Sequence, residues 1–94
     1  MNIIIPDYLF AAINRLCTGV ESKILFTIIA HTSNKPFIPT TEYMLNMTGL
    51  TQKNHYFVNR KKLIDKGYIN IASDGSLGID INKIISDYNL LTSS

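Results

Sequence analysis

The feature that most constrains the fold is an amphipathic segment enclosed by two glycines, Gly49 and Gly67. Its apolar side chains recur at helical spacing, which predicts a helix that Thr51 caps and that continues to Lys66. The side chains expected in the core lie within one narrow arc of this helix: Tyr56, Phe57, Leu63 and Ile64. The aliphatic stem of Arg60 lies between them. The opposite side is mostly polar: Asn54, His55, Val58, Lys61, Lys62 and Asp65.

Two helices are expected nearer the amino terminus. The first begins at Asp7, has apolar residues at helical spacing and is stopped by Gly19. Thr18 and Glu21 form a capping box, in which the threonine oxygen accepts from a first-turn amide and the glutamate reaches back to the cap. This box predicts the start of the second helix, which continues to about His31.

A short helix follows, which Thr40 caps and in which Met44 and Leu45 face inward. Gly49 ends it tightly, because glycine adopts a left-handed conformation without a steric penalty. Two helices joined by such a turn predict a helix-turn-helix over about residues 40–66.

Residues 68–72 and 77–81 are typical of two strands of a hairpin, or wing, over about residues 68–81. Asn82 caps a last helix over about residues 82–91. The chain is therefore predicted to be a single winged helix-turn-helix domain over residues 1–94. Its fold class is mainly α with a small β-hairpin (α+β).

The register of the hairpin follows from burial of one of its faces. Pairing Ile71 with Ile79 and Ile69 with Ile81 gathers the four isoleucines on one face. This pairing predicts a loop with an odd number of residues, three or five, and Gly75 at a positive φ.

Composition excludes several classes of protein. The 94 residues suffice for one small domain, and 46% apolar against 17% charged residues exclude an intrinsically disordered chain. The longest nearly apolar stretch, residues 24–30, is too short to span a bilayer. Cys17, the single cysteine, excludes a disulfide framework and indicates a cytoplasmic protein. No metal site, cofactor site or enzyme active site is predicted.

Positive charge is concentrated in the helix between the two glycines. Residues 53–66 contain five basic side chains and one acidic one, a net charge of +4, whereas the whole chain carries +2. This concentration predicts contact with an anionic partner, of which double-stranded DNA is the first candidate. A helix face that is merely solvated is the alternative.

Short polar side chains in the first turns of a recognition helix reach base edges in the major groove. The predicted base-reading set is Gln52, Lys53, Asn54, His55 and Asn59. Asparagine and glutamine pair with adenine in a bidentate way, and lysine favours guanine. The alternative for Gln52 and Asn54 is an ordinary polar first turn.

The predicted phosphate-contacting set is Thr40, Thr41, Tyr56, Arg60, Lys61 and Lys62. The two threonines stand at a helix amino terminus, and the basic side chains lie later in the basic helix, where they suit phosphates. Two alternatives are open: Thr40 only caps its helix, or Arg60 lays its stem on the core and pairs with an acid. The wing tip at Asp74 has no basic residue, so we do not expect it to enter a minor groove.

Four stretches resemble the amino-terminal domain of lambda-type phage replication protein O and of related phage and plasmid replication initiators. They are IPDYL at 5–9, TGVESKIL at 18–25, PTTEYMLNMTGL at 39–50 and KLIDKGYI at 62–69, and the likeness covers about residues 4–72. One departure is a basic helix about one residue longer than usual. In that family the domain binds repeated sites at a replication origin, so the resemblance implies DNA binding in a bacterial or phage-infected cell.

We therefore expect sequence-specific binding of double-stranded DNA, in phage or plasmid replication initiation or in transcription regulation. The alternative is a winged-helix module that binds protein without binding DNA. Its mark would be apolar residues on the outer side of the basic helix, where only Val58 qualifies.

The last helix carries an apolar side made of Ile84, Ile85, Tyr88 and Leu91. Two arrangements are open for it. It pairs with a second copy to form a homodimer, or it packs against the first helix of its own chain.

Overall fold

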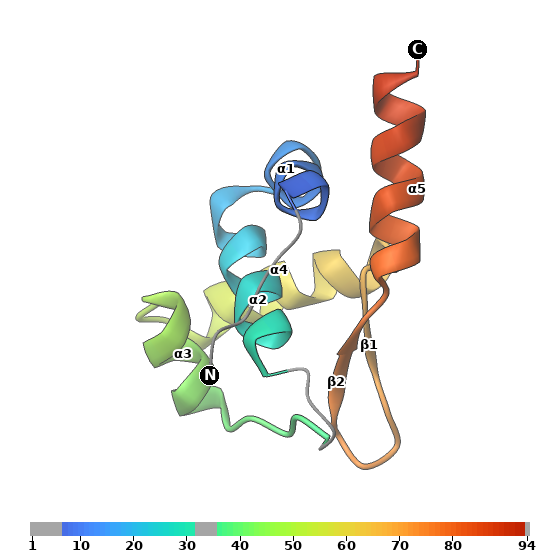
Figure 1. Ribbon diagram of the computed structural model, residues 1–94. Helices are drawn as coiled ribbons and strands as arrows, with labels where there is room; N and C mark the ends of the chain where they lie inside the picture. The colour runs from blue at the N-terminus through green and yellow to red at the C-terminus, as the bar shows by residue number, and fades with distance from the viewer. Residues whose placement is uncertain (1–6, 32–35, 94) are drawn as a thin grey trace.

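The computed structural model describes residues 7–31 and 36–93, which form five helices and one two-stranded antiparallel hairpin (Figure 1). The elements in chain order are α1 (Asp7–Leu16), α2 (Gly19–Ala30), α3 (Thr41–Thr48), α4 (Lys53–Asp65), β1 (Ile69–Ile71), β2 (Leu77–Ile79) and α5 (Ile81–Thr92). The predicted fold class, mainly α with a small β-hairpin, is confirmed.

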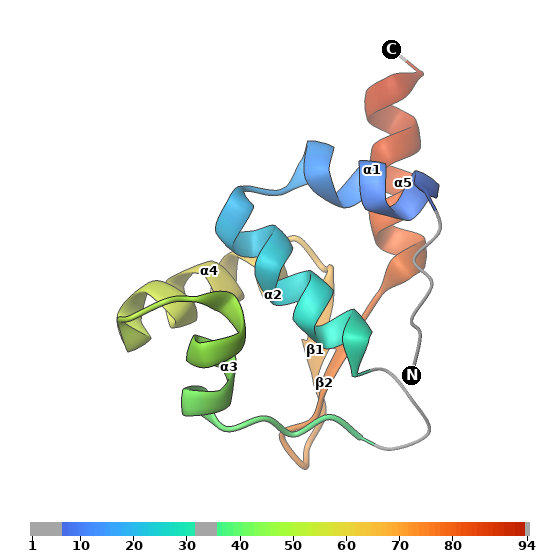
Figure 2. The same cartoon turned by 60° about the vertical axis from the view of Figure 1, so that its left-hand side comes forward.

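The central element is α2, which packs against α1, α3, α4 and β2 (Figure 2). Ile24, Leu25 and Ile28 have no exposed surface, and even the polar side chains of Glu21 and Thr27 are buried. A helix with buried residues on all sides forms the core itself, and the other elements surround it.

The capping box at the start of α2 is confirmed. The hydroxyl oxygen of Thr18 accepts from the Glu21 amide at 3.3 Å, and Glu21 Oε1 accepts from the Thr18 amide at 2.9 Å. The prediction that Gly19 stops the first helix is wrong. That helix ends at Leu16, and Gly19 is the first residue of α2 because the cap directly precedes it.

The other carboxylate oxygen of Glu21 connects α2 with the end of α4. It accepts from Lys66 Nζ at 2.8 Å, and Nζ also donates to the Leu16 carbonyl oxygen at 3.4 Å. Burial alone would raise the pKa of Glu21, but the bonds from Lys66 and Thr18 outweigh it and lower the pKa below the ordinary 4.5. This ion pair therefore links the ends of three helices.

In the hairpin, Ile69 pairs with Ile79 and Ile71 pairs with Leu77. The predicted partners of both residues, Ile81 for Ile69 and Ile79 for Ile71, are therefore wrong. The observed pairing is displaced by two residues, which leaves every side chain on the same face, so burial of one face does not distinguish the two registers.

The loop of the hairpin matches the sequence prediction. The Ala72 amide donates to the Ser76 carbonyl oxygen at 2.9 Å, which leaves three residues in the loop. Gly75, the last of them, has a φ of +88°. The odd loop length and the positive φ are both confirmed.

The last helix, α5, packs against α1 (Figures 1 and 2). Its cap is Asp80, which accepts from the Lys83 amide at 3.0 Å, so the prediction of Asn82 as the cap is wrong. Ile84 has no exposed surface and belongs to the core. Packing of the last helix on the first, one of the two arrangements left open by the sequence, is confirmed.

We expect Glu21→Gln to lower the free energy of unfolding at pH 7 by about 2 kcal/mol, because it leaves Lys66 without its charged partner. This is below the roughly 3–5 kcal/mol of a fully buried pair, since the Lys66 side chain is 37% exposed. Because the folded-state pKa of Glu21 is lowered, its stabilisation is present above the ordinary pKa of 4.5 and is lost as the pH falls through the folded-state pKa.

Urea unfolding at pH 7 and in acid measures this loss. The difference between the two proteins should shrink in acid, and an equal difference at both pH values would contradict the assignment. Glu42→Gln is the matched control, because Glu42 is exposed on α3. It should change the free energy by less than about 0.5 kcal/mol.

Candidate nucleic-acid interface

A tight turn between α3 and α4 sets the direction of the basic helix. Gly49 has a φ of +73°, and the Leu50 amide donates to the Leu45 carbonyl oxygen at 3.1 Å. This left-handed glycine ends α3 as predicted.

The first residue of α4 is Lys53, and its cap position is Gln52, whose side chain makes no capping bond. The prediction that Thr51 caps this helix is therefore wrong. The cap falls one residue later, because Gln52 is the last residue with an extended backbone before the helix, at a φ of −118° and a ψ of 129°.

One side of α4, which we call the outer face, is open to solvent along the whole helix. It consists of Lys53, Asn54, His55, Val58, Lys61, Lys62 and Asp65, all of them exposed. The adjoining Gln52 is exposed as well. Four of the five predicted base-reading residues therefore lie at the surface, at the start of α4.

The fifth predicted base-reading residue, Asn59, is not available at the surface. It is 6% exposed, and its side-chain amide donates to the His55 carbonyl oxygen at 2.8 Å. It shares the inner side of α4 with the buried Tyr56 and Leu63. The helical spacing of these three residues was the signal in the sequence that a polar side chain lies inward here.

Phe57 was predicted in the core but is 41% exposed. The inner line of α4 runs through Tyr56, Asn59 and Leu63, so Phe57 falls to its flank. The Arg60 guanidinium lies over the Phe57 ring, 5.4 Å from its centre. With Val58, which is 53% exposed, α4 therefore exposes two large apolar side chains.

The basic side chains of α4, and that of Lys66 directly after it, differ in whether they are free to contact a phosphate. Lys66 is bound to Glu21 and does not contribute to the outer face. Lys61 pairs with Asp65 at 3.3 Å, but both side chains are mostly exposed. Such a pair contributes only about 0.3–0.5 kcal/mol, so a phosphate can replace the carboxylate. Lys53, Arg60, Lys61 and Lys62 remain as candidate phosphate contacts.

The predicted phosphate-contacting residues of α3 have a structural role as well. Thr40 is the cap of α3, where its hydroxyl oxygen accepts from the Tyr43 amide at 3.1 Å, so its capping role is confirmed, while its contact with phosphate stays a prediction. Thr41, Tyr56 and Arg60 come together around one small pocket. Tyr56 is only 2% exposed and is held in the core by the inner side of α4.

The tip of the wing is acidic. The Asp74 carboxylate accepts from the Ser76 amide at 2.9 Å, and hydrogen bonds from the Ser76 hydroxyl and amide lower the pKa of the exposed Asp74. A carboxylate at this position repels phosphates, and the expectation that the hairpin tip does not enter a minor groove stays a prediction.

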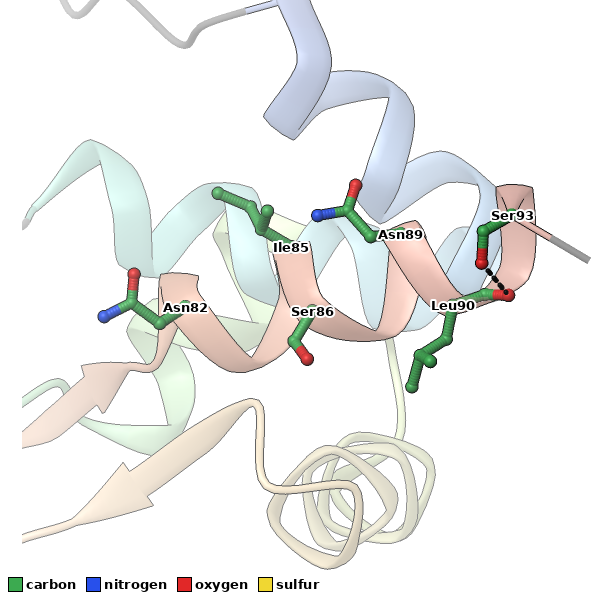
Figure 3. A pocket seen from close by; sticks show the side chains of 6 residues that line it. All are labelled: Asn82, Ile85, Ser86, Asn89, Leu90 and Ser93. Carbon is green, nitrogen blue, oxygen red and sulfur yellow. Dashed lines mark hydrogen bonds between the residues drawn. The ribbon is translucent and has the colours of Figure 1, made fainter.

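A shallow hollow of about 430 Å³ lies along α5, and all its lining residues belong to that helix or its carboxyl-terminal cap (Figure 3). Its lining is uncharged: Asn82, Ile85, Ser86, Asn89, Leu90 and Ser93. The Ser93 hydroxyl donates to the Leu90 carbonyl oxygen at 3.4 Å. None of these side chains titrates near neutral pH, so the hollow has no group for acid–base chemistry.

Within residues 7–31 and 36–93, no three histidine, cysteine, aspartate or glutamate side chains are grouped so that they could bind a metal ion. No helix in the same ranges has the length and apolar character needed to cross a membrane. Comparisons of the chain with protein-family models, with curated proteins and with solved structures found no match.

We expect Gly49→Ala to lower the free energy of unfolding by about 1–2 kcal/mol, the cost of a left-handed conformation for a residue with a Cβ atom. Packing does not contribute, because no atom lies within 4 Å of a Cβ built at Gly49. Gly19→Ala is the matched control: it adds a Cβ in equally open space, but on a helical backbone.

The control should stabilise the protein by up to about 1 kcal/mol, because alanine favours the helix. Chemical denaturation of both variants measures the two effects. Equal effects of the two substitutions would show that the turn does not require glycine.

Proposed function

We propose that this protein is a winged helix-turn-helix domain that binds double-stranded DNA with sequence preference, using α4 as its recognition helix. The observation that carries the proposal is the outer face of α4, which is exposed and rich in basic and amide side chains. This helix follows α3 across a tight glycine turn and precedes the hairpin, which is the element order of the proposed fold.

The outer face supports two kinds of contact with DNA. Gln52, Lys53, Asn54 and His55 stand at the amino-terminal end of α4, which is the part of a recognition helix that meets base edges. Lys61 and Lys62 lie further along the helix and suit backbone phosphates, which position the protein without reading sequence.

The resemblance to phage and plasmid replication initiators favours a role in replication initiation, and transcription regulation is the second role that fits. Selecting bound sequences from random duplex DNA and locating them in the source genome separates the two. Clustered repeats at an origin support replication initiation, and single sites at promoters support regulation.

A module that binds protein is the second candidate function. Phe57 and Val58, both exposed on α4, favour it, since exposed apolar side chains on a helix suit a protein partner. The four basic groups at the same helix favour DNA, because the core of a protein interface is depleted of charge. The salt dependence of binding distinguishes the two candidates.

We expect the affinity for duplex DNA to fall steeply with salt. If Lys53, Arg60, Lys61 and Lys62 each neutralise one phosphate, the plot of log affinity against log salt should have a slope near about −3.6. Removing two of these charges with the double variant Lys61→Ala, Lys62→Ala should bring the slope to about −1.8 and weaken all sequences alike.

The matched control is Arg15→Ala with Lys23→Ala, which removes two exposed positive charges from α1 and α2. Fluorescence anisotropy at several salt concentrations measures the slopes. The control should keep a slope near the wild-type value, and equal slopes for the two double variants would contradict the placement of DNA on α4.

We expect Asn54→Ala to cost about 1–3 kcal/mol of binding free energy on the selected sequence and little on random DNA, because an amide that reads a base adds only specific affinity. Asn89→Ala, at an exposed position of α5, is the control and should change neither affinity. Competition binding with the two kinds of DNA gives both values. An equal loss on both DNAs would remove Asn54 from the base-reading set.

A further inference from the structure

A small pocket of about 50 Å³ lies where three separate parts of the chain meet. They are α4, the hairpin, and the segment that leads into α3 and passes beside the hairpin (Figures 1 and 2). The pocket is lined by Pro39, Thr41, Tyr56, Arg60, Gly75 and Leu77. The meeting point is fixed by backbone pairing, since the Leu77 amide donates to the Phe37 carbonyl oxygen at 2.8 Å.

Arg60, which lines this pocket, carries an unsatisfied hydrogen-bond donor. Its Nε atom is buried and has no hydrogen-bond partner among the described residues. A buried donor without a partner destabilises a protein, and more so when it is charged. Such an atom in a folded protein usually has a water molecule or an ion as its partner. The half-buried Arg60 therefore lines the pocket with a guanidinium whose hydrogen bonds are not all satisfied within the described residues.

The other polar groups of the lining are donors too. Burial raises the pKa of Tyr56, although the charge of Arg60 and its bond with the tyrosine act against this, so the Tyr56 hydroxyl keeps its proton at neutral pH. The Thr41 hydroxyl is a third donor, and no carboxylate lines the pocket. A planar guanidinium beside two hydroxyls suits the oxygens of a tetrahedral oxyanion.

The size of the pocket limits what enters. A cavity of about 10–15 Å³ suffices to hold one water molecule, so a pocket of about 50 Å³ admits the oxygens of one small anion. We propose that this pocket binds a single phosphate group through Arg60, Tyr56 and Thr41. That the phosphate belongs to a DNA backbone rests on the proposed function, whereas the binding of a phosphate group does not.

This assignment gives the acidic hairpin a function. Gly75 and Leu77 form one wall of the pocket, so the hairpin supports the phosphate site, while the Asp74 carboxylate accepts from the Ser76 amide and does not line the pocket.

The test is a titration of the full ¹⁵N-labelled chain with inorganic phosphate at pH 7, with ionic strength held constant by chloride. The wild-type protein should show saturable shifts of the Thr41, Gly75 and Leu77 amides and of the Arg60 Nε–H signal. Arg60→Gln should weaken phosphate binding at least tenfold. Lys23→Gln, which removes the same charge from an exposed position of α2, should change it less than twofold.

Arg60→Lys is a second variant, which keeps the charge but has no guanidinium. Its amide spectrum reports whether it is folded, and it should lose phosphate as Arg60→Gln does. The absence of saturable shifts in the wild-type protein, or equal phosphate binding by all variants, would overturn the proposal and leave the pocket to an ordered water.

Titration with duplex DNA separates this proposal from the proposed function. Phosphate binding that depends on Arg60, without any binding of DNA, would support the site for a free phosphate and contradict the DNA-binding function. Salt-dependent DNA binding that Arg60→Gln and Arg60→Lys leave unchanged, together with unchanged phosphate binding, would keep the function and reject the site.

Discussion

The arrangement of the helices depends on one carboxylate, that of Glu21. One of its oxygens accepts from the Thr18 amide and fixes the start of the central helix, and the other accepts from Lys66 after the end of α4. Lys66 in turn contacts the carbonyl oxygen at the end of α1. Because a charge this buried is stable only when it is paired, the pair tolerates few other positions for the carboxyl end of α4.

The position of α4 is thus fixed at one end by an ion pair and at the other by a backbone turn. At the carboxyl end the ion pair holds it to α2, and at the amino end the left-handed Gly49 turns the chain from α3. The same ion pair changes the electrostatics of the proposed interface, because it removes Lys66 from the surface charge. What remains is a row of basic and amide side chains with a short apolar flank, held at a fixed angle to the hairpin.

Several local features of this fold could be predicted from the sequence, because they depend on residues a few positions apart, although the end of α1 and the caps of α4 and α5 lie at other residues than predicted. The Thr18–Glu21 box, the Thr40 cap and the Gly49 turn are of this kind. The pairing of Glu21 with Lys66 spans 45 residues, so no local pattern indicates it. The burial of Asn59 was indicated by its helical spacing from Tyr56 and Leu63. It was missed because a polar residue in a recognition helix is expected at the surface. The pocket at Arg60 joins three segments distant in sequence and could not be foreseen.

The packing of α5 on α1 brings together the first and the last helix of the described chain. Closing so long a loop costs chain entropy before any contact is gained, so this pairing should form late when the chain folds. During synthesis, a chain that has been made only as far as the hairpin still lacks Ile84 and exposes the face of α1 that α5 covers. The domain therefore completes its core only after α5 has left the ribosome, and until then that face is open to other chains.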